Sequence, residues 1–452
     1  MKKNRFTTYL LALALTAGLL APFSAAKALS TDDMQVAAKA AILVDTNYGE
    51  VLFEQNAHDK LFPASITKVM TGLLAIEAVE AGKFTMDQPI TATQAVNSGM
   101  MSGASTQNIK AGEIMSFGDV LRCALIPSAN EACNILAELV GGSIEGFVAL
   151  MNERAAALGC ENTHFMNPHG LHDDNHYTTA YDISLICIEA MKSPIFREIV
   201  SSKSYSVPAT NLAPIRELHD TNALISTFRI RGYYYENATG IKTGFTPEAG
   251  YCLASAATEG NRSLVAVVLG CTRVEGTTGS DGHTYFSESK RLLEWGFDNF
   301  SRRTIIDGTE PLLNIPVTLS EEADHVVGQP DGSIEATLPQ DLNLADFKRT
   351  VTANTETLEA PVQKGQLLGK VTLSYGGKDY GTLNLVAVDG VARSELLYRI
   401  DRIEKFFSQL WVKLLLLFLI AVILFLVLRF LVFGKRRRKA AARRNYSGHK
   451  RR

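Results

Sequence analysis

Three short motifs follow one another along the chain, and each contains side chains that can do chemistry. The first is Ser65-Ile66-Thr67-Lys68, the second is Ser128-Ala129-Asn130, and the third is Lys242-Thr243-Gly244. Together they supply an activated hydroxyl, a second hydroxyl with an amide, and a cation beside a third hydroxyl. This set, in this order, suits a serine acyl-transfer reaction on a substrate that ends in a carboxylate.

Ser65 and Lys68 have the spacing of a nucleophile and its base. Residues 63–81 are predicted to form a helix that begins at a Pro-Ala pair, and positions i and i+3 share one helix face. A neutral lysine can take the serine proton if burial and nearby cations lower its pKa. The alternative is a capping serine beside a surface lysine, because this spacing is common. A second copy, Ser287-Glu288-Ser289-Lys290, lacks the Pro-Ala start and is interpreted as an exposed helix face.

The second motif lies in a loop between two predicted helices, where side chains can be aimed into a cleft. Ser128 could relay a proton to the leaving amine, and Asn130 could hold both the substrate amide and the lysine. The alternative is that Ser128 caps the helix that follows it, which is a common role for serine.

The third motif lies on or beside a predicted strand, whose edge can dock an extended peptide. Lys242 and Thr243 would bind a terminal carboxylate, and Gly244 would allow close backbone approach. The backbone N–H groups of Ser65 and Phe245 are then candidates for an oxyanion hole. The alternative is an ordinary exposed turn.

The elements that must position these motifs are predicted to be strands, then helices, then strands. Residues 40–45 and 50–54 form one strand pair, 117–200 are mainly helical, and 250–257 and 263–269 form a second pair before a closing helix at 285–297. This order indicates an α+β or sandwiched α/β domain whose sheet joins the N- and C-terminal pieces. We expect it to occupy residues 29–297, followed by a small all-β domain over 298–391 and a helical stalk over 392–409.

Both ends of the chain differ from its middle. Residues 1–28 have the basic start, short apolar run and small-residue cleavage site of a signal peptide; the alternative is an uncleaved anchor. Residues 410–433 are almost all apolar and long enough to span a bilayer, and the basic tail 434–452 marks the cytoplasmic side. We therefore expect a single-pass protein of the cell membrane with its catalytic domain outside the cytoplasm.

Two other interpretations of the C-terminal region are weaker. Nucleic-acid binding by the basic tail is not expected, because the preceding span explains its charge. A monotopic amphipathic helix is disfavoured, because residues 410–433 are apolar on all sides.

Outside the signal, span and tail, the chain has 29 basic and 47 acidic residues, a formal charge of −18. This acidic balance gives no support for binding a polyanion.

Cysteines and histidines do not predict a metal or a disulfide framework. The six cysteines form no C-x-x-C pair and lie mostly in apolar stretches, so we expect mostly free, buried thiols. Four histidines crowd the segment 164–176, which raises zinc as an alternative, but their spacing fits no compact ligand pattern. We expect no metal and no cofactor.

The motifs resemble those of the serine D-alanyl-D-alanine carboxypeptidases, the low-molecular-mass penicillin-binding proteins. The resemblance extends to Pro63–Met70, to Asn167–Leu171 with Thr179–Asp182, and to Lys242–Thr246 with the following Ala249-Gly250. It covers nearly the whole exported chain, including a β-rich second domain and a C-terminal anchor.

The resemblance implies a penicillin-binding, β-lactamase-like transpeptidase fold and a two-step reaction. Ser65 would attack the penultimate D-alanine carbonyl of a peptidoglycan stem peptide, the terminal D-alanine would leave, and water would hydrolyse the acyl-enzyme. Lys68 would be the general base of acylation and the simplest candidate for deacylation. β-Lactams would mimic the substrate and acylate Ser65. The remaining site residues would be Ser128 for catalysis and Asn130, Lys242, Thr243, Gly244 and Phe245 for binding.

Several other functions could use the same site. They are transpeptidation or D,D-endopeptidase activity, β-lactamase activity, and penicillin sensing with a cytoplasmic readout. Ala129 stands where class A β-lactamases carry aspartate, and no dedicated deacylation glutamate is evident, so a β-lactamase is disfavoured. The 19 residues after position 433 are too few for a folded signalling domain, which disfavours a sensor.

Overall fold

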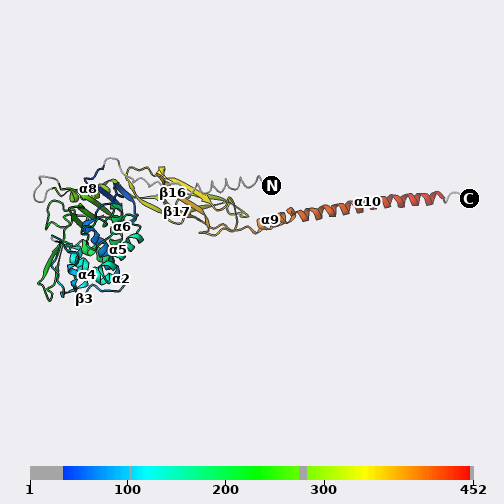
Figure 1. Cartoon of the computed structure of the whole chain (residues 1–452). Helices are drawn as coiled ribbons and strands as arrows, with labels where there is room; N and C mark the ends of the chain where they lie inside the picture. Colours follow the sequence, from blue (N-terminus) through cyan, green and yellow to red (C-terminus); the bar gives the residue numbers. More distant parts are fainter. Residues whose placement is uncertain (1–33, 102, 274–281, 448–452) are drawn as a thin grey trace, which may run out of the picture. The chain divides into compact units, whose positions relative to one another are not determined.

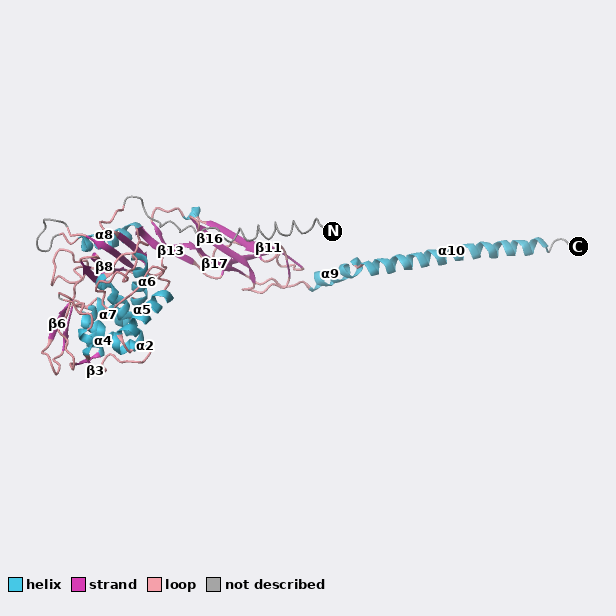
Figure 2. Ribbon diagram, viewed as in Figure 1, coloured by secondary structure: helices cyan, strands magenta, loops and turns pink. Residues whose placement is uncertain are grey.

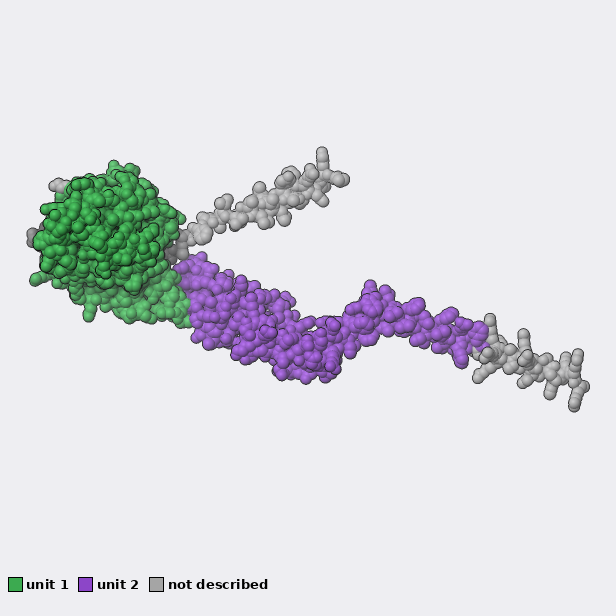
Figure 3. Space-filling model, turned by 90° about the horizontal axis from the view of Figure 1, so that it is seen from below, with its two compact units in different colours: residues 1–304, 335–344 green, residues 305–334, 345–452 purple. Residues whose placement is uncertain are grey.

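The computed structural model describes residues 34–101, 103–273 and 282–447 of the 452-residue chain. The chain divides into two compact units, which Figure 3 colours separately. Unit 1 comprises residues 1–304 and 335–344, and unit 2 comprises residues 305–334 and 345–452. The predicted signal peptide, residues 1–28, lies outside the described residues.

A five-stranded antiparallel sheet forms the centre of unit 1, with the strand order β2-β1-β9-β8-β7. The sheet joins N- and C-terminal pieces of the chain, as predicted. β7, which carries the third motif, lies at one edge and pairs only with β8 within this sheet. The strands are β1 (Ala40–Asp45), β2 (Val51–Gln55), β7 (Ala238–Thr246), β8 (Gly250–Glu259) and β9 (Arg262–Cys271).

The two faces of this sheet bury their side chains in two different apolar clusters. In β9, Val265 and Val267 belong to one cluster, whereas Leu264 and Ala266 belong to the other. Because side chains alternate along a strand, one face packs against α2–α7 and the other against α8 (Figure 2). This confirms the predicted sandwiched α/β architecture. The helices are α2 (Lys68–Glu80), α3 (Phe117–Leu125), α4 (Asn130–Gly141), α5 (Ile144–Ala157), α6 (Ala180–Ala190), α7 (Pro194–Val200) and α8 (Thr284–Asn299).

Several short elements were not predicted from the sequence. Most are strands of two to six residues, too short to show a clear period of two. They include two small hairpins in unit 1 and one strand pair, β10 with β13. These elements are β3 (Pro89–Thr91), β4 (Ile114–Ser116), β5 (Ser204–Val207), β6 (Arg216–His219), β10 (Phe300–Ile306), β12 (His325–Pro330), β13 (Ile334–Pro339), β15 (Leu358–Glu359), η2 (Gln94–Asn97) and η3 (Leu344–Asp346). The predicted helix over residues 63–81 begins with a 3₁₀ turn, η1 (Ala64–Thr67).

Unit 2 contains a six-stranded sheet in the order β14-β16-β17-β12-β11-β15 and two C-terminal helices (Figure 1). Within α10, the segment Leu410–Leu431 has a mean hydropathy of 3.2 and is long and apolar enough to cross a membrane. The bent pair α4 and α5 also passes that test as a unit, but its apolar residues lie in the core of unit 1. The remaining elements are β11 (Leu313–Thr318), β14 (Lys348–Ala353), β16 (Leu367–Tyr375), β17 (Lys378–Ala387), α9 (Glu395–Ser408) and α10 (Leu410–Ser447).

All six cysteines lie in unit 1, and all are buried free thiols, as the sequence indicated. Burial raises the pKa of the Cys133 thiol to about 11, although this residue lies near the positive charge of Lys68. A thiol with so high a pKa stays protonated at neutral pH and is a poor nucleophile.

Candidate active site

The first motif spans a short turn and the start of the helix that follows it. Ser65 lies in the 3₁₀ turn η1, and Lys68 is the first residue of α2, which continues directly from that turn. Lys68 Nζ lies 2.8 Å from Ser65 Oγ and also donates a hydrogen bond to the carbonyl oxygen of His169, at 2.8 Å. The predicted pairing of these two side chains is therefore present, with Ser65 partly exposed and Lys68 fully buried.

Burial lowers the pKa of the Lys68 ammonium to about 8. The neighbouring Cys133 and Glu131 act in the opposite direction, so desolvation is the dominant cause. At neutral pH a useful fraction of Lys68 is therefore neutral, and a neutral amine 2.8 Å from a serine hydroxyl can accept its proton.

The second motif presents two buried polar atoms without a protein partner. Ser128 has a left-handed backbone with φ of 73°, and neither its Oγ nor Oδ1 of Asn130 has a hydrogen-bond partner among the described residues. The residue that caps α4 is Ala129, and no side chain caps this helix. Ser128 therefore does not have the capping role that was the alternative. Both atoms are available to a ligand, because buried polar groups normally have a partner.

The loop that holds the second motif is tied to a preceding segment. Asn130 donates its backbone N–H to the carbonyl oxygen of Ser105, and Ser105 Oγ donates to the carbonyl oxygen of Pro127. Buried Glu131 accepts hydrogen bonds from Thr106 Oγ1 at 2.7 Å and from the backbone N–H of Gln107 at 2.6 Å. These bonds fix the backbone on both sides of Ser128.

The third motif lies on edge strand β7, against the turn η1 that contains Ser65. A Cβ placed on Gly244 would lie 3.0 Å from the backbone nitrogen of Ser65, so the two backbones approach closely here. Lys242 is buried, and burial together with the charge of Lys68 lowers the pKa of its ammonium group. Phe245 is 52 % exposed at the end of the strand.

A polar segment that the sequence analysis missed supports β7. Thr221 Oγ1 and Thr243 Oγ1 are 2.6 Å apart, and Asn222 Nδ2 donates to the carbonyl oxygen of Gly240 at 3.0 Å. Asp220 is buried, and its charge opposes the lowering of the Lys242 pKa. The signal available in the sequence was three polar residues directly before an apolar run, Ala223–Ile225.

The histidine-rich segment, residues 164–176, packs against the turn that contains Ser65. Its residue Gly170 has φ of +83°, and a Cβ there would lie 1.9 Å from the carbonyl oxygen of Ala64. His176 Nδ1 accepts from the backbone N–H of Met166, so its Nε2–H donates to Thr67 Oγ1, 2.9 Å away. Thr67 Oγ1 in turn donates to the Ala64 carbonyl oxygen.

Both buried histidines of this segment are held neutral. Burial lowers the pKa of His169 to about 3 and that of His176 to about 4. His169 Nδ1 accepts from the backbone N–H of Leu171, so each ring has one nitrogen engaged by the backbone of its own segment. These rings are explained by packing and hydrogen bonding around the turn of Ser65.

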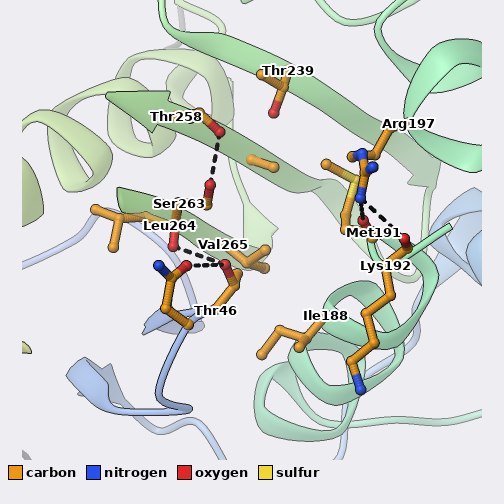
Figure 4. Close-up of a pocket in the computed structure, with 12 residues that line it drawn as sticks. Thr46, Ile188, Met191, Lys192, Arg197, Thr239, Thr258, Ser263, Leu264 and Val265 are labelled. Carbon is orange, nitrogen blue, oxygen red and sulfur yellow. Dashed lines mark hydrogen bonds between the residues drawn. The ribbon is translucent and has the colours of Figure 1, made fainter. Parts of the chain in front are cut away.

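A separate cavity of about 310 Å³ lies at the opposite end of strands β7–β9 (Figure 4). Its lining includes Thr239, Thr258 and Ser263, whereas the third motif approaches the backbone of Ser65 near Gly244. Arg197 borders the cavity, but its guanidinium donates to the carbonyl oxygens of Met191 and Lys192. The cavity is thus distinct from the site that the motifs form.

Comparison with known proteins identifies the family. The peptidase S11 family model, described as D-alanyl-D-alanine carboxypeptidase, matches residues 25–273. A second model, the C-terminal domain of penicillin-binding protein 5, matches residues 322–393.

Curated relatives and solved structures agree with these matches. D-alanyl-D-alanine carboxypeptidase DacA of Escherichia coli K12 is 32 % identical over 414 residues, covering 88 % of this chain and 96 % of that protein. DacF of Bacillus subtilis is 29 % identical over 378 residues, covering 83 % and 91 %. Penicillin-binding protein 5 of Haemophilus influenzae has a TM-score of 0.61 and 28 % identity, covering 80 % of this chain and all of that one. The chain therefore belongs to the peptidase S11 family of D-alanyl-D-alanine carboxypeptidases.

Proposed function

We propose that Ser65 is the nucleophile and Lys68 the general base with which this chain removes the terminal D-alanine of peptidoglycan stem peptides. The observation that carries the proposal is the 2.8 Å contact between the buried, pKa-lowered Lys68 amine and the Ser65 hydroxyl. Lys68 takes the proton as Ser65 Oγ bonds to the penultimate D-alanine carbonyl carbon. The peptide bond then breaks, and the departing D-alanine amine receives a proton.

The second motif would act on the leaving group and on the substrate backbone. Ser128 Oγ would pass the proton to the departing amine, and Asn130 would hold the substrate amide. Support comes from the two buried oxygens of these side chains, which have no hydrogen-bond partner among the described residues. Water then attacks the acyl-enzyme, with Lys68 again the nearest base to the ester oxygen of Ser65.

The third motif would bind the substrate along the edge of β7. Lys242 and Thr243 would bind the terminal carboxylate, and Gly244 would allow the substrate backbone close to the strand. The N–H groups of Ser65 and Phe245 would stabilise the tetrahedral oxyanion. Since a β-lactam is also a carboxylate-bearing acylating amide, it would react with Ser65 by the same steps.

The proposal is tested on soluble protein that lacks the C-terminal helix. We expect release of D-alanine from a pentapeptide ending in D-Ala-D-Ala. After incubation with a β-lactam, peptide mass spectrometry should find the adduct on the peptide that contains Ser65. An adduct on the peptide of Ser287, which belongs to the other Ser-x-x-Lys sequence, would refute the assignment.

Acylation should depend on pH through Lys68. Only the neutral amine can accept the Ser65 proton, and the neutral fraction grows as pH rises toward a pKa of about 8. We expect the second-order rate of β-lactam acylation to rise about tenfold per unit well below pH 8 and to level off above it. Stopped-flow measurements with a chromogenic cephalosporin between pH 5.5 and 9.5 check this. A flat profile across that range would exclude Lys68 as the titrating base.

Thr221 should determine how well the site recognises a carboxylate. The Thr221 hydroxyl lies 2.6 Å from the Thr243 hydroxyl. If Thr221 accepts or donates a hydrogen bond at this contact, it fixes the direction in which the Thr243 hydroxyl points. We expect Thr221→Val to raise KM about tenfold for a peptide ending in a free carboxylate, as a lost hydrogen bond to a charged partner would.

Two controls separate this effect from general damage to the sheet. With the same peptide carrying a C-terminal amide, Thr221→Val protein should be nearly as active as the unsubstituted protein. Thr258→Val removes a comparable hydroxyl pair with Ser263, at 2.9 Å, at the other end of the sheet and should leave KM unchanged. Equal losses with the carboxylate and amide peptides would show that Thr221 has no part in carboxylate recognition.

We infer further that α10 anchors the enzyme in the cell membrane, with the catalytic unit outside and the C-terminus in the cytoplasm. Leu410–Leu431 contains 22 residues, about 33 Å of helix, and the basic run at 435–439 follows it. Protease added to intact protoplasts should degrade the catalytic unit and spare an epitope tag at the C-terminus. Loss of the tag epitope under the same conditions would reverse the orientation.

A further inference from the structure

Helix α9, Glu395–Ser408, carries a stripe of exposed apolar side chains, and exposed Phe406 lies at its edge. Leu396, Ile400, Ile403 and Phe407 follow one another at spacings of four, three and four residues, and they are 63 %, 44 %, 57 % and 48 % exposed. A spacing that alternates between four and three residues is the 3.5-residue period of a coiled coil. A helix with such a stripe buries it against another helix when it pairs with one.

The charged residues beside this stripe favour one kind of partner. With Ile400 and Phe407 at the a positions and Leu396 and Ile403 at the d positions, Arg399 falls at g and Glu404 at the following e position. In a parallel pair of helices, g of one chain faces the next e of the other. Two copies of α9 would therefore form two symmetric Arg399–Glu404 ion pairs. In an antiparallel pair, g faces g and e faces e, so Arg399 and Glu404 would not pair.

Both charged side chains are available for this contact. Other residues of the helix have partners within the chain, such as Lys405, which pairs with Asp401 and Glu359. Neither Arg399 nor Glu404 makes an ion pair with any residue in the described parts of the chain. Both are exposed on the flanks of the apolar stripe.

A membrane surface fits this helix less well. A helix that lies in the lipid interface has a broad apolar face and an excess of basic residues that attract anionic lipid. In α9 the basic residues Arg399, Arg402 and Lys405 are balanced by Glu395, Asp401 and Glu404, which leaves no net charge. Glu404 lies beside one edge of the stripe and Arg399 beside the other.

We propose that α9 pairs in parallel with α9 of a second copy of this chain, through the stripe Leu396–Phe407 and two Arg399–Glu404 ion pairs. Two heptads are too short to associate strongly in solution. The pairing therefore rests on the proposed anchoring by α10, which begins at Leu410 and would hold both copies in one membrane plane at high effective concentration. Parallel orientation is also the one that two anchors in one membrane impose.

Cysteine cross-linking of the full chain in lipid vesicles tests the pairing. All six native cysteines are buried, so a single new surface thiol dominates the reaction with an added oxidant. We expect Ile403→Cys to give at least fivefold more disulfide-linked dimer than Lys405→Cys, whose side chain lies on the opposite side of the helix. Equal cross-linking at both positions, or none at Ile403→Cys, would overturn the proposal.

Charge exchange tests the predicted register independently of folding. In the Ile403→Cys background, Glu404→Arg should lower the dimer yield by roughly fivefold, since exposed ion pairs contribute modestly and repulsion replaces them. Adding Arg399→Glu to that variant should restore the yield. No recovery in the double variant would refute the register.

Protection of the Ile403→Cys thiol by lipid alone, without cross-linking, would assign the stripe to the membrane surface and overturn the proposal. Release of D-alanine, measured in parallel, reports on the catalytic site separately.

Discussion

Replacing Ser65 by alanine is expected to lower kcat/KM for D-alanine release by at least about 10⁴-fold and to abolish covalent binding of β-lactams. Without the hydroxyl, the amine of Lys68 has no proton to accept, and no acyl-enzyme can form. The protein should remain folded, because Ser65 Oγ contacts the amine of Lys68 in a partly exposed position. The measurements are D-alanine release from a pentapeptide, labelling by a fluorescent penicillin, and thermal unfolding.

The chain provides its own matched control for this substitution. Ser287 also precedes a lysine by three residues, but its hydroxyl donates to the carbonyl oxygen of Thr284 within α8. Ser287→Ala should therefore keep full activity and full labelling. If Ser65→Ala protein still released D-alanine at a tenth of the original rate, the nucleophile would have to be another residue.

The pairing of Ser65 with Lys68 could be predicted because it is local. Residues three apart on one helix face are neighbours, so their contact needs no long-range packing to bring them together. The close approach of the first and third motifs could not be predicted from local spacing, because 177 residues separate Ser65 from Lys242. The contact of Gly244 with the backbone of Ser65 depends on how β7 packs against η1, which no local pattern encodes.

The parts of the site that could not be predicted consist of groups that support other groups. Thr221 acts on the hydroxyl of Thr243, and His176 acts on Thr67 and through it on the carbonyl of Ala64. Such residues have ordinary types and no characteristic spacing, since their partner is 22 residues away in one case and 109 in the other. The burial of His176 and the position of Thr221 beside Thr243 become visible only once the chain has folded.

Substituting Gly170 by alanine is expected to damage catalysis although this residue touches no substrate group in the proposed reaction. Its φ of +83° is strained for any side chain, and a new Cβ would lie 1.9 Å from the Ala64 carbonyl oxygen and 2.7 Å from Thr67 Oγ1. The neighbouring backbone must therefore shift, and Ala64 directly precedes the nucleophile. Displacing a reacting atom by about 1 Å can cost about 100-fold in rate, so we expect at least that loss in β-lactam acylation.

Gly159→Ala separates displacement of the nucleophile from simple backbone strain. Gly159 has nearly the same φ, +84°, but no atom lies within 4 Å of the position of its Cβ. The Gly159→Ala protein should lose about 1 kcal/mol of folding free energy and keep its rate of acylation by β-lactam, because only the conformational penalty of a positive φ applies. Gly170→Ala should lose about 3 kcal/mol, since overpacking adds to that penalty. Acylation rates and chemical denaturation of both variants give the comparison. If Gly170→Ala were acylated as fast as Gly159→Ala, the loop of Gly170 would contribute stability alone, and the position of Ser65 would have to be fixed by β7 and α2.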